Sequence, residues 1–455
     1  MTKIIAYMPA FLRQKLEKHS GLSKIIENFG WLFIDKILVM MVGMVVMIWM
    51  ANYLGEANYG KYNYGRAFLE FFVVIATLGF DSLIVRDMVK MPEMRGRLMG
   101  TSFGLRLVGG VLMLLTSYLV IVLLRPEDTL MHVIIVVFAS AYLFKALDVI
   151  DLWFQAEVQS KYAVWARNGA FLLITGVKIY LIMSKAPLLA FVAAEVVMDA
   201  LIVLGLWLMY RYTGESLRSW KFDWSLGKRL LREGAPLSLS TIMIVIYMKV
   251  DQVMIGEMIA DNDKSVGIYS MAAKFSEIFY FIPMILGSSF FPALIKSKEL
   301  GDKVYHDRFQ SFFDLNSGIA MLISLPASLL APVVFFWLFK GKYAGADAMF
   351  AIHIWGSIFV FLGVARNRYL INEGLLKESF WFTIAGAVVN VGLNLWLIPK
   401  YQGYGAALAT LASYMVSGYL TSFMLPRLHR IAWMQTKSLL IPFTFWKYLK
   451  KNHEL

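Results

Sequence analysis

The stretch YMKVDQVMIGEMIADNDKSVGIYSMAAKFSEIFYFIP, from Tyr247 to Pro283, decides the fold of this chain. It predicts two membrane-spanning helices joined by a short polar turn, Ile259 to Val266. Four ionisable residues lie inside its apolar runs: Lys249, Asp251, Lys274 and Glu277. A charge at bilayer depth costs about 3 kcal/mol even on the mildest scale, so such residues face a cavity or a partner. The stretch therefore indicates a polar interior inside a membrane protein.

The same hairpin occurs earlier in the chain. Gly60-Lys61-Tyr62 aligns with Gly267-Ile268-Tyr269, and Phe68, Glu70 and Phe72 align with Phe275, Glu277 and Phe279. A duplicated hairpin that carries buried charge predicts two halves built around one polar interior.

The composition supports the membrane class. Of the 455 residues, 59% are hydrophobic and 16% are charged, whereas soluble domains carry about 25% charged residues. The chain has no cysteine, which excludes disulfides and thiolate metal sites, and its six histidines lack ligand spacing, so no metal or cofactor is predicted. The net charge of +13 is typical of loops held near anionic lipid, and we expect no nucleic-acid partner.

Apolar runs of membrane-spanning length predict an all-α polytopic protein with twelve transmembrane helices. The spans begin near Gly30, Gly65, Thr101, Thr129, Ala163, Pro187, Gly234, Gly267, Ser311, Asp347, Ser379 and Gly403. Most Lys and Arg residues lie in alternate connections: the two tails and segments 85–100, 156–167, 211–232, 295–310 and 366–378. This alternation predicts that both termini are cytoplasmic.

The longest basic connection divides the chain into two lobes of six helices. The predicted parts are a cytoplasmic tail (1–29), a first lobe (30–210), a cytoplasmic linker (211–232), a second lobe (233–427) and an amphipathic C-terminal tail (428–455). Six is an even number, so both lobes insert the same way up, and the repeat is parallel, about an axis along the membrane normal.

Helical spacing separates the charges of the opening stretch. Lys249 and Asp251 lie on opposite sides of one helix, and Asp251, which shares a polar stripe with Tyr247, is the better candidate for the lumen. Lys274 and Glu277 share a face of the next helix. These residues either bind substrate or form a structural salt bridge.

Two further spans carry clustered charge. Lys145 and Asp148 share one sector of the fourth span. Glu195 and Asp199 are four residues apart in the sixth span, with no basic residue on that face. Two close carboxylates in low dielectric cannot both ionise cheaply, which is what an ion-coupling relay requires. Helix packing through protonated carboxyls is the alternative.

Several stretches together resemble the polysaccharide-unit flippases, which are Wzx-like members of the MATE/MOP exporter superfamily. They are WMANYLGEANYGKYNYGRAF (Trp49–Phe68), LGFDSLIVRDMVK (Leu78–Lys90), DLWFQAEVQSKYAVWAR (Asp151–Arg167), the opening stretch and NLWLIPKYQGYGAALATLASY (Asn394–Tyr414). The resemblance implies alternating access between two six-helix lobes. It also implies a cargo, an undecaprenyl-pyrophosphate-linked oligosaccharide moved from the inner to the outer leaflet of the bacterial cytoplasmic membrane, for O-antigen or capsule synthesis.

A pyrophosphate headgroup needs fixed cations near the entry leaflet. Lys145 and Arg366 have that depth in opposite lobes, and Lys36 is a third candidate. The predicted substrate-binding residues are Lys36, Lys145, Asp148, Lys178, Asp251, Lys274, Glu277 and Arg366, and the predicted ion-coupling residues are Glu195 and Asp199.

The sequence contains no P-loop, HExxH motif or nucleophile elbow, so we expect a transporter and no enzyme. Membrane lipids are expected partners, and a polysaccharide polymerase and glycosyltransferases are candidate ones. The main alternative is a cation-coupled small-molecule or multidrug antiporter on the same fold. A membrane-embedded polymerase or glycosyltransferase is less favoured, because such enzymes place catalytic residues on large outer loops that this chain lacks.

Overall fold

The computed structural model describes the backbone of residues 20–444 and the side chains of residues 39–444 except 240. The predicted tails beyond these limits and the side chain of Lys36 lie outside this description. Within it every regular element is helical, as predicted. The first half contains α2 (Ser20–Thr77), α3 (Asp81–Lys90), α4 (Arg95–Leu124), α5 (Thr129–Lys145), α6 (Val149–Ala156), α7 (Lys161–Met183) and α8 (Leu188–Tyr212).

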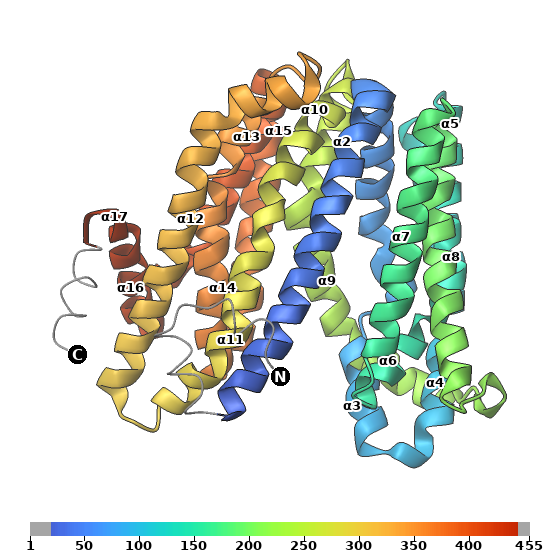
Figure 1. Ribbon diagram of the computed structural model, residues 1–455, viewed down its shortest axis with the longest axis horizontal. Coiled ribbons are helices and arrows are strands. Elements are labelled where there is room, and N and C mark those ends of the chain that lie inside the picture. The colour runs from blue at the N-terminus through green and yellow to red at the C-terminus, as the bar shows by residue number, and fades with distance from the viewer. Residues whose placement is uncertain (1–19, 445–455) are drawn as a thin grey trace.

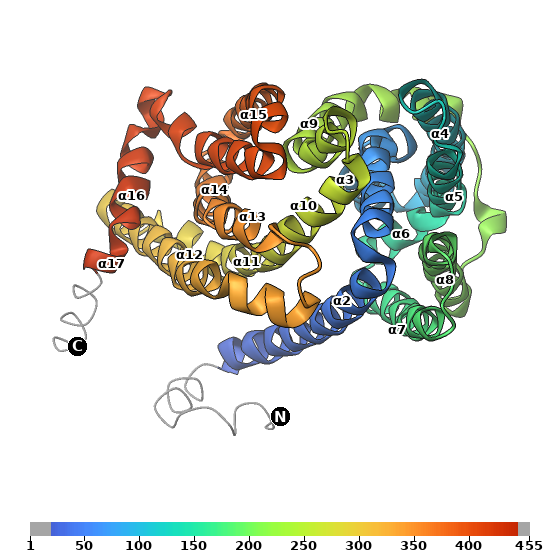
Figure 2. The same cartoon turned by 90° about the horizontal axis from the view of Figure 1, so that it is seen from above.

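The second half repeats this order of long helices. It contains α9 (Trp224–Met258), α10 (Asn262–Glu277), α11 (Phe281–Ser297), α12 (Asp302–Phe339), α13 (Ala346–His353), α14 (Gly356–Asn372), α15 (Leu376–Gly418), α16 (His429–Leu439) and α17 (Ile441–Thr444). Single 3-10 turns join α5 to α6 and α10 to α11. In Figure 2, α4–α8 lie on one side of the molecule and α11–α17 on the other.

Two kinks convert ten apolar helical segments into twelve passes. The described residues contain ten helical segments long and apolar enough to cross a membrane, and two of these span 52 and 48 residues. At 1.5 Å per residue each is about twice the length needed for one crossing. The chain reverses inside both, at Gly55 (φ 74°, ψ 174°) in α2 and at Gln402 (φ 51°, ψ −131°) in α15. The structure therefore agrees with the predicted twelve helices.

The second pass begins at the Gly55 kink, before the predicted start at Gly65. Residues 56–64 carry Glu56 and Lys61 and are not apolar enough to be recognised by hydropathy, yet they are helical. This error concealed one residue of the candidate site, described below.

The two ends of the molecule differ in their connections. One end, here called the kink end, carries the α2 and α15 kinks and the α4–α5, α7–α8, α9–α10 and α12–α13 connections (Figure 1). The opposite end, here called the linker end, carries α3, the 213–223 connection between α8 and α9, and the α11–α12 and α14–α15 turns. All the internal basic segments that the sequence assigns to one side of the membrane include connections at the linker end.

The apolar cores show how the halves meet. One core cluster joins residues of both halves, among them Tyr59, Tyr62, Tyr269 and Phe335, which lie toward the kink end. The two other clusters draw on one half each: residues 80–230 form one and residues 294–434 form the other. The halves are therefore packed together toward the kink end and have separate cores toward the linker end. The start of α9 belongs to the first half's cluster through Leu226 and Leu230.

The repeat is visible where α2 and α10 cross. A Cβ on Gly60 would overlap the carbonyl of Asp263, and a Cβ on Gly267 would overlap the carbonyl of Glu56. Gly60 and Gly267 occupy equivalent positions of the repeat, as do Glu56 and Asp263. The contact is thus reciprocal, as expected at a two-fold axis, and equivalent helices of the two halves run in the same direction (Figure 1). The predicted parallel repeat agrees with this geometry.

Candidate functional site

A cavity of about 540 Å³ lies between the two halves. One wall is the apolar face of the first part of α2, where Met40, Met44, Met47 and Met50 follow each other at helical spacing. The opposite part is charged: Arg66 on α2, Lys178 on α7, Glu195 on α8, and Lys274 and Glu277 on α10. The cavity is therefore amphipathic, with an apolar wall beside a cluster of charges.

Two smaller cavities adjoin the first. One, of about 130 Å³, is lined by Glu70, Tyr142, Lys145 and Asp199. The other, of about 170 Å³, is lined by Asn63, Glu70, Lys249 and Lys274. Arg66 lines all three, so it marks the point where they meet.

Arg66 lines this site but was not identified from the sequence, and Glu70 and Lys249, which also line it, were not among the predicted binding residues. The Arg66 side chain is 49% exposed although it lies in the middle of the fold, because it projects into the cavities. It lies 3.6 Å from Glu195 and donates to the Tyr62 hydroxyl at 3.4 Å. The signal available in the sequence was its position one helical turn before Glu70, but the predicted span began at Gly65 and left Arg66 at the interface.

The carboxylates of α8 each have a cation from another helix. Glu195 accepts from Lys178 on α7 at 2.5 Å and from the Tyr62 hydroxyl on α2. Asp199 lies 3.4 Å from Lys145 on α5. The face of α8 itself has no basic residue, as the sequence indicated, yet the packing supplies one to each carboxylate. Glu195 and Asp199 are therefore each paired with a lysine. The sequence had instead predicted two neighbouring carboxylates without a basic partner.

Lys274 connects the two halves. It belongs to α10 in the second half, but it donates to Asn63 at 2.5 Å and to Tyr59 at 3.3 Å on α2 in the first half. Among the described residues it has no carboxylate within ion-pair distance. Glu277, on the same face, is paired instead with Lys249 at 3.0 Å. Lys274 is thus a cavity-lining cation bound only by neutral groups.

The cavity walls carry a small excess of positive charge. Their cations are Arg66, Lys145, Lys178, Lys249 and Lys274, and their carboxylates are Glu70, Glu195, Asp199 and Glu277. Glu70 and Glu277 occupy equivalent positions of the repeat, so each half contributes the same acid.

Three of the predicted substrate-binding residues do not line these cavities. Asp251 is 4% exposed and accepts from the hydroxyls of Tyr269 and Thr410 inside the second half. Asp148 lies in the 3-10 turn between α5 and α6. Arg366 is 5% exposed and lies inside the second half.

Arg366 is bound within the second half. It donates to the hydroxyls of Thr421 and Ser422 at 3.1 and 3.0 Å and to the Ser417 carbonyl at 2.6 Å. Its guanidinium lies 4.4 Å from the centre of the Phe382 ring. The structure therefore brings Lys145, Lys178, Lys274, Glu277, Glu195 and Asp199 together around the cavities, and leaves Asp148, Asp251 and Arg366 outside them.

Comparison with known proteins places this geometry in context. The sequence pattern of a family described as polysaccharide biosynthesis protein matches residues 25–298, more than half of the chain. An uncharacterized membrane protein, YabM of Bacillus subtilis (strain 168), is 24% identical over 435 residues, which cover 87% of this chain and 80% of YabM.

Two solved structures share the fold. One is the lipid II flippase MurJ in an inward closed conformation, with a TM-score of 0.73 and 12% identity, covering 91% of this chain and 92% of MurJ. The other is an inward-facing multidrug resistance MATE family transporter of the MOP superfamily, with a TM-score of 0.70 and 16% identity, covering 86% of this chain and 95% of the transporter. The fold is that of the MOP superfamily, as the sequence predicted.

Proposed function

Because the chain belongs to the polysaccharide biosynthesis protein family, we propose that it is a flippase for undecaprenyl-pyrophosphate-linked oligosaccharides. It moves these units from the inner to the outer leaflet of a bacterial cytoplasmic membrane by alternating access between its two lobes, residues 30–210 and 233–427. The sugars serve a surface polysaccharide such as O-antigen or capsule.

The observation that carries this proposal is the amphipathic cavity. A lipid-linked saccharide has an apolar chain, an anionic diphosphate and a polar sugar, so its site needs apolar and cationic walls side by side. The methionine face of α2 supplies the first, since flexible thioether side chains fit varied apolar shapes. Arg66 and Lys274 supply the second, and guanidinium geometry suits a phosphate.

Lys274 also supports a way for cargo to drive the conformational change. It comes from the second half and is held by two groups of the first half. A diphosphate that binds Lys274 and Arg66 replaces these neutral partners and changes a contact between the halves. Such a ligand shifts the equilibrium only if it binds the two states differently. Lys145 and Lys178 add positive charge around the same space.

The orientation follows from the basic segments. Positively charged connections favour the cytoplasmic side, so the linker end faces the cytoplasm and both termini lie there. The halves have separate cores at this end and are joined at the other, which is a cytoplasm-facing arrangement. The inward-facing conformation of the MATE transporter supports this arrangement. Glycosyltransferases that build the saccharide and a polymerase that consumes it are the corresponding partners.

The second candidate is a cation-coupled drug antiporter, favoured by the MATE fold. A cationic drug or coupling ion requires an available carboxylate. Three of the four cavity carboxylates, Glu195, Asp199 and Glu277, are paired with lysines, which favours an anionic cargo.

The test uses proteoliposomes with a fluorescent undecaprenyl-pyrophosphate oligosaccharide and measures its movement between leaflets. A charge-assisted hydrogen bond contributes about 1.5–3 kcal/mol, so Arg66→Ala and Lys274→Ala should each reduce the rate about tenfold or more. Lys185→Gln, which removes an exposed cation at the α7–α8 turn, is the control and should leave the rate unchanged. Full transport by a folded Arg66→Ala/Lys274→Ala variant would contradict this headgroup site. Transport of a small organic cation in place of the lipid would favour the antiporter.

A further inference from the structure

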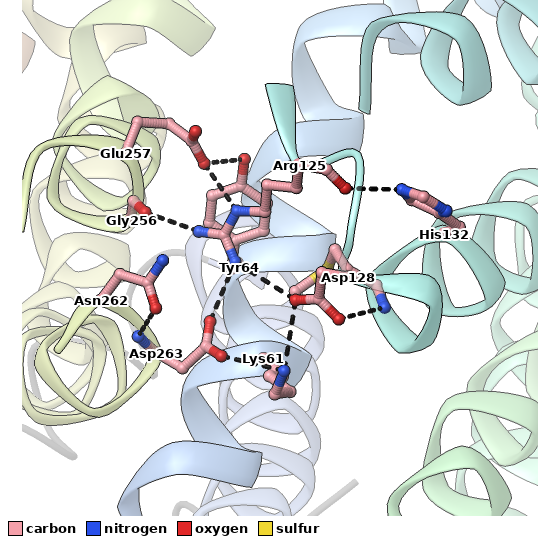
Figure 3. Close-up of polar contacts among 10 residues, drawn as sticks. Lys61, Tyr64, Arg125, Asp128, His132, Gly256, Glu257, Asn262 and Asp263 are labelled. Carbon is pink, nitrogen blue, oxygen red and sulfur yellow. Dashed lines mark hydrogen bonds and ion pairs between the residues drawn. The ribbon is translucent and has the colours of Figure 1, made fainter. Parts of the chain in front are cut away.

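A compact ionic network closes the kink end. Arg125, on the α4–α5 loop of the first half, reaches the α9–α10 turn of the second half (Figure 3). It donates to Glu257 at 2.8 Å, to Asp263 at 3.0 Å and to the Gly256 carbonyl at 2.6 Å. Its side chain is 7% exposed and stacks 3.9 Å from the centre of the Tyr64 ring.

Arg125 and Asp263 form a ring of alternating charge with two further residues, Lys61 and Asp128. Asp263 binds both Arg125 and Lys61 at 3.0 Å, and Asp128 binds Lys61 at 3.2 Å and lies 3.8 Å from Arg125. Lys61, Arg125 and Asp128 belong to the first half, and only Asp263 comes from the second. Separation of the halves at this end must therefore remove Asp263 from two cations at once.

Contacts within the first half also hold the loop that carries Arg125. Asp128 caps α5 by accepting from the Met131 amide, and a ring nitrogen of His132 lies 2.7 Å from the Arg125 carbonyl (Figure 3). Burial disfavours the charged guanidinium, but Tyr64, Glu257 and Asp263 favour it more strongly, so the pKa of Arg125 lies above its ordinary value. The loop presents a fixed positive charge to the second half.

The repeat provides an internal comparison. Glu56 is the equivalent of Asp263, and it too reaches across to the other half, where it accepts from the Tyr343 amide at 2.6 Å and lies 3.4 Å from Lys264. Lys264, however, is 48% exposed, whereas Arg125 is 7% exposed. A buried charge left without its partner is far more costly than a broken surface pair. The two sides of the axis thus bear unequal ionic contacts.

We infer that Arg125 is the latch of the kink end, and that this end opens only when Arg125 releases Glu257 and Asp263. The contact of Glu56 with Lys264, on the other side of the axis, contributes little to closure. The latch determines how readily the protein reaches its second, kink-open conformation, whichever cargo the cavity takes.

The test is a distance measurement by pulsed electron paramagnetic resonance, without substrate, on the full chain in lipid nanodiscs. The chain has no cysteine, so two spin labels can be attached at Glu127→Cys and Asp261→Cys, exposed positions on the two connections that the latch joins. Arg125→Ala should increase the ratio of long to short distances about tenfold or more. Lys264→Ala is the matched control and should change that ratio less than about twofold.

Two further variants guard against misfolding. Asp263→Asn weakens the latch from the other half and should open the same end, and Arg125→Lys, which keeps the charge but loses the forked geometry, should give an intermediate ratio. The inference fails if the short distance persists in Asp263→Asn and in any folded Arg125→Ala. It also fails if Lys264→Ala opens this end as far as Arg125→Ala. Neither result bears on the proposed cargo, because no cargo is present.

Discussion

Arg366 and Lys274 show that two basic residues inside a membrane protein have different tasks according to what surrounds them. Arg366 is buried and its two terminal nitrogens are bound by Ser417, Thr421 and Ser422, whereas Lys274 lines the cavity. We expect Arg366→Ala to lower the free energy of unfolding by about 3 kcal/mol, because it strands buried acceptors and opens a void. Thermal or denaturant unfolding of the purified protein measures this.

Lys377→Ala is the control for Arg366→Ala, since Lys377 is exposed near the same end and should leave stability unchanged. Lys274→Ala should have the opposite effect: it should abolish transport and leave the free energy of unfolding nearly unchanged. If Arg366→Ala instead unfolds like the wild type and abolishes transport, the headgroup is bound at Arg366, as the sequence analysis expected.

At the scale of elements, the α2–α10 crossing depends on two glycines. Replacing a helical glycine by alanine ordinarily stabilises a helix by about 0.5–1 kcal/mol. At Gly60 the added methyl would overlap the Asp263 carbonyl, so we expect Gly60→Ala to destabilise the protein by about 1–3 kcal/mol instead. A decrease in the free energy of unfolding would therefore show that α2 and α10 are in close contact at Gly60, and an increase would show that they are not.

Gly176→Ala is the matched control for the crossing. Gly176 lies in α7, and a Cβ there would meet no atom within 4 Å, so only the helical preference should act, and it favours alanine. A Gly60→Ala variant as stable as Gly176→Ala would mean that α2 and α10 do not approach so closely.

For the whole molecule, the division of the cores predicts access from one side. Because the halves are joined at the kink end, a cysteine replacing Lys178 in the cavity should react with a charged thiol reagent added at the linker end. The same reagent added at the kink end should not reach it. Labelling in oriented membrane vesicles gives both rates.

Asp251→Cys is the comparison for this accessibility test. Asp251 is 4% exposed inside the second half, so a cysteine there should stay protected from either side while Lys178→Cys reacts. Equal labelling of Lys178→Cys from both sides would refute the closed kink end. When Arg125→Ala is added to Lys178→Cys, the cysteine should also react with reagent added at the kink end.

The sequence by itself determined the class, the number of passes and the repeat. A bilayer leaves the backbone no partner except its own hydrogen bonds, so apolar runs of sufficient length must be helices. The alternation of basic connections then assigns each end of each helix to one side of the membrane. The repeat was readable because Gly60 and Gly267 carry the same steric requirement at one crossing. These are local properties of the chain, and they do not depend on which helices become neighbours.

Only the tertiary structure decided which charges share a space. Glu195 has no cation on its own face of α8 and obtains one from Lys178 on another helix, and Lys274 finds its partners in the opposite half. Arg66 was placed at the membrane interface because the preceding residues, 56–64, were too polar to be recognised as part of the span. Helical spacing gives the face of a residue but not what that face meets. Ion pairs form between helices distant in sequence, so their partners depend on the packing of the whole bundle.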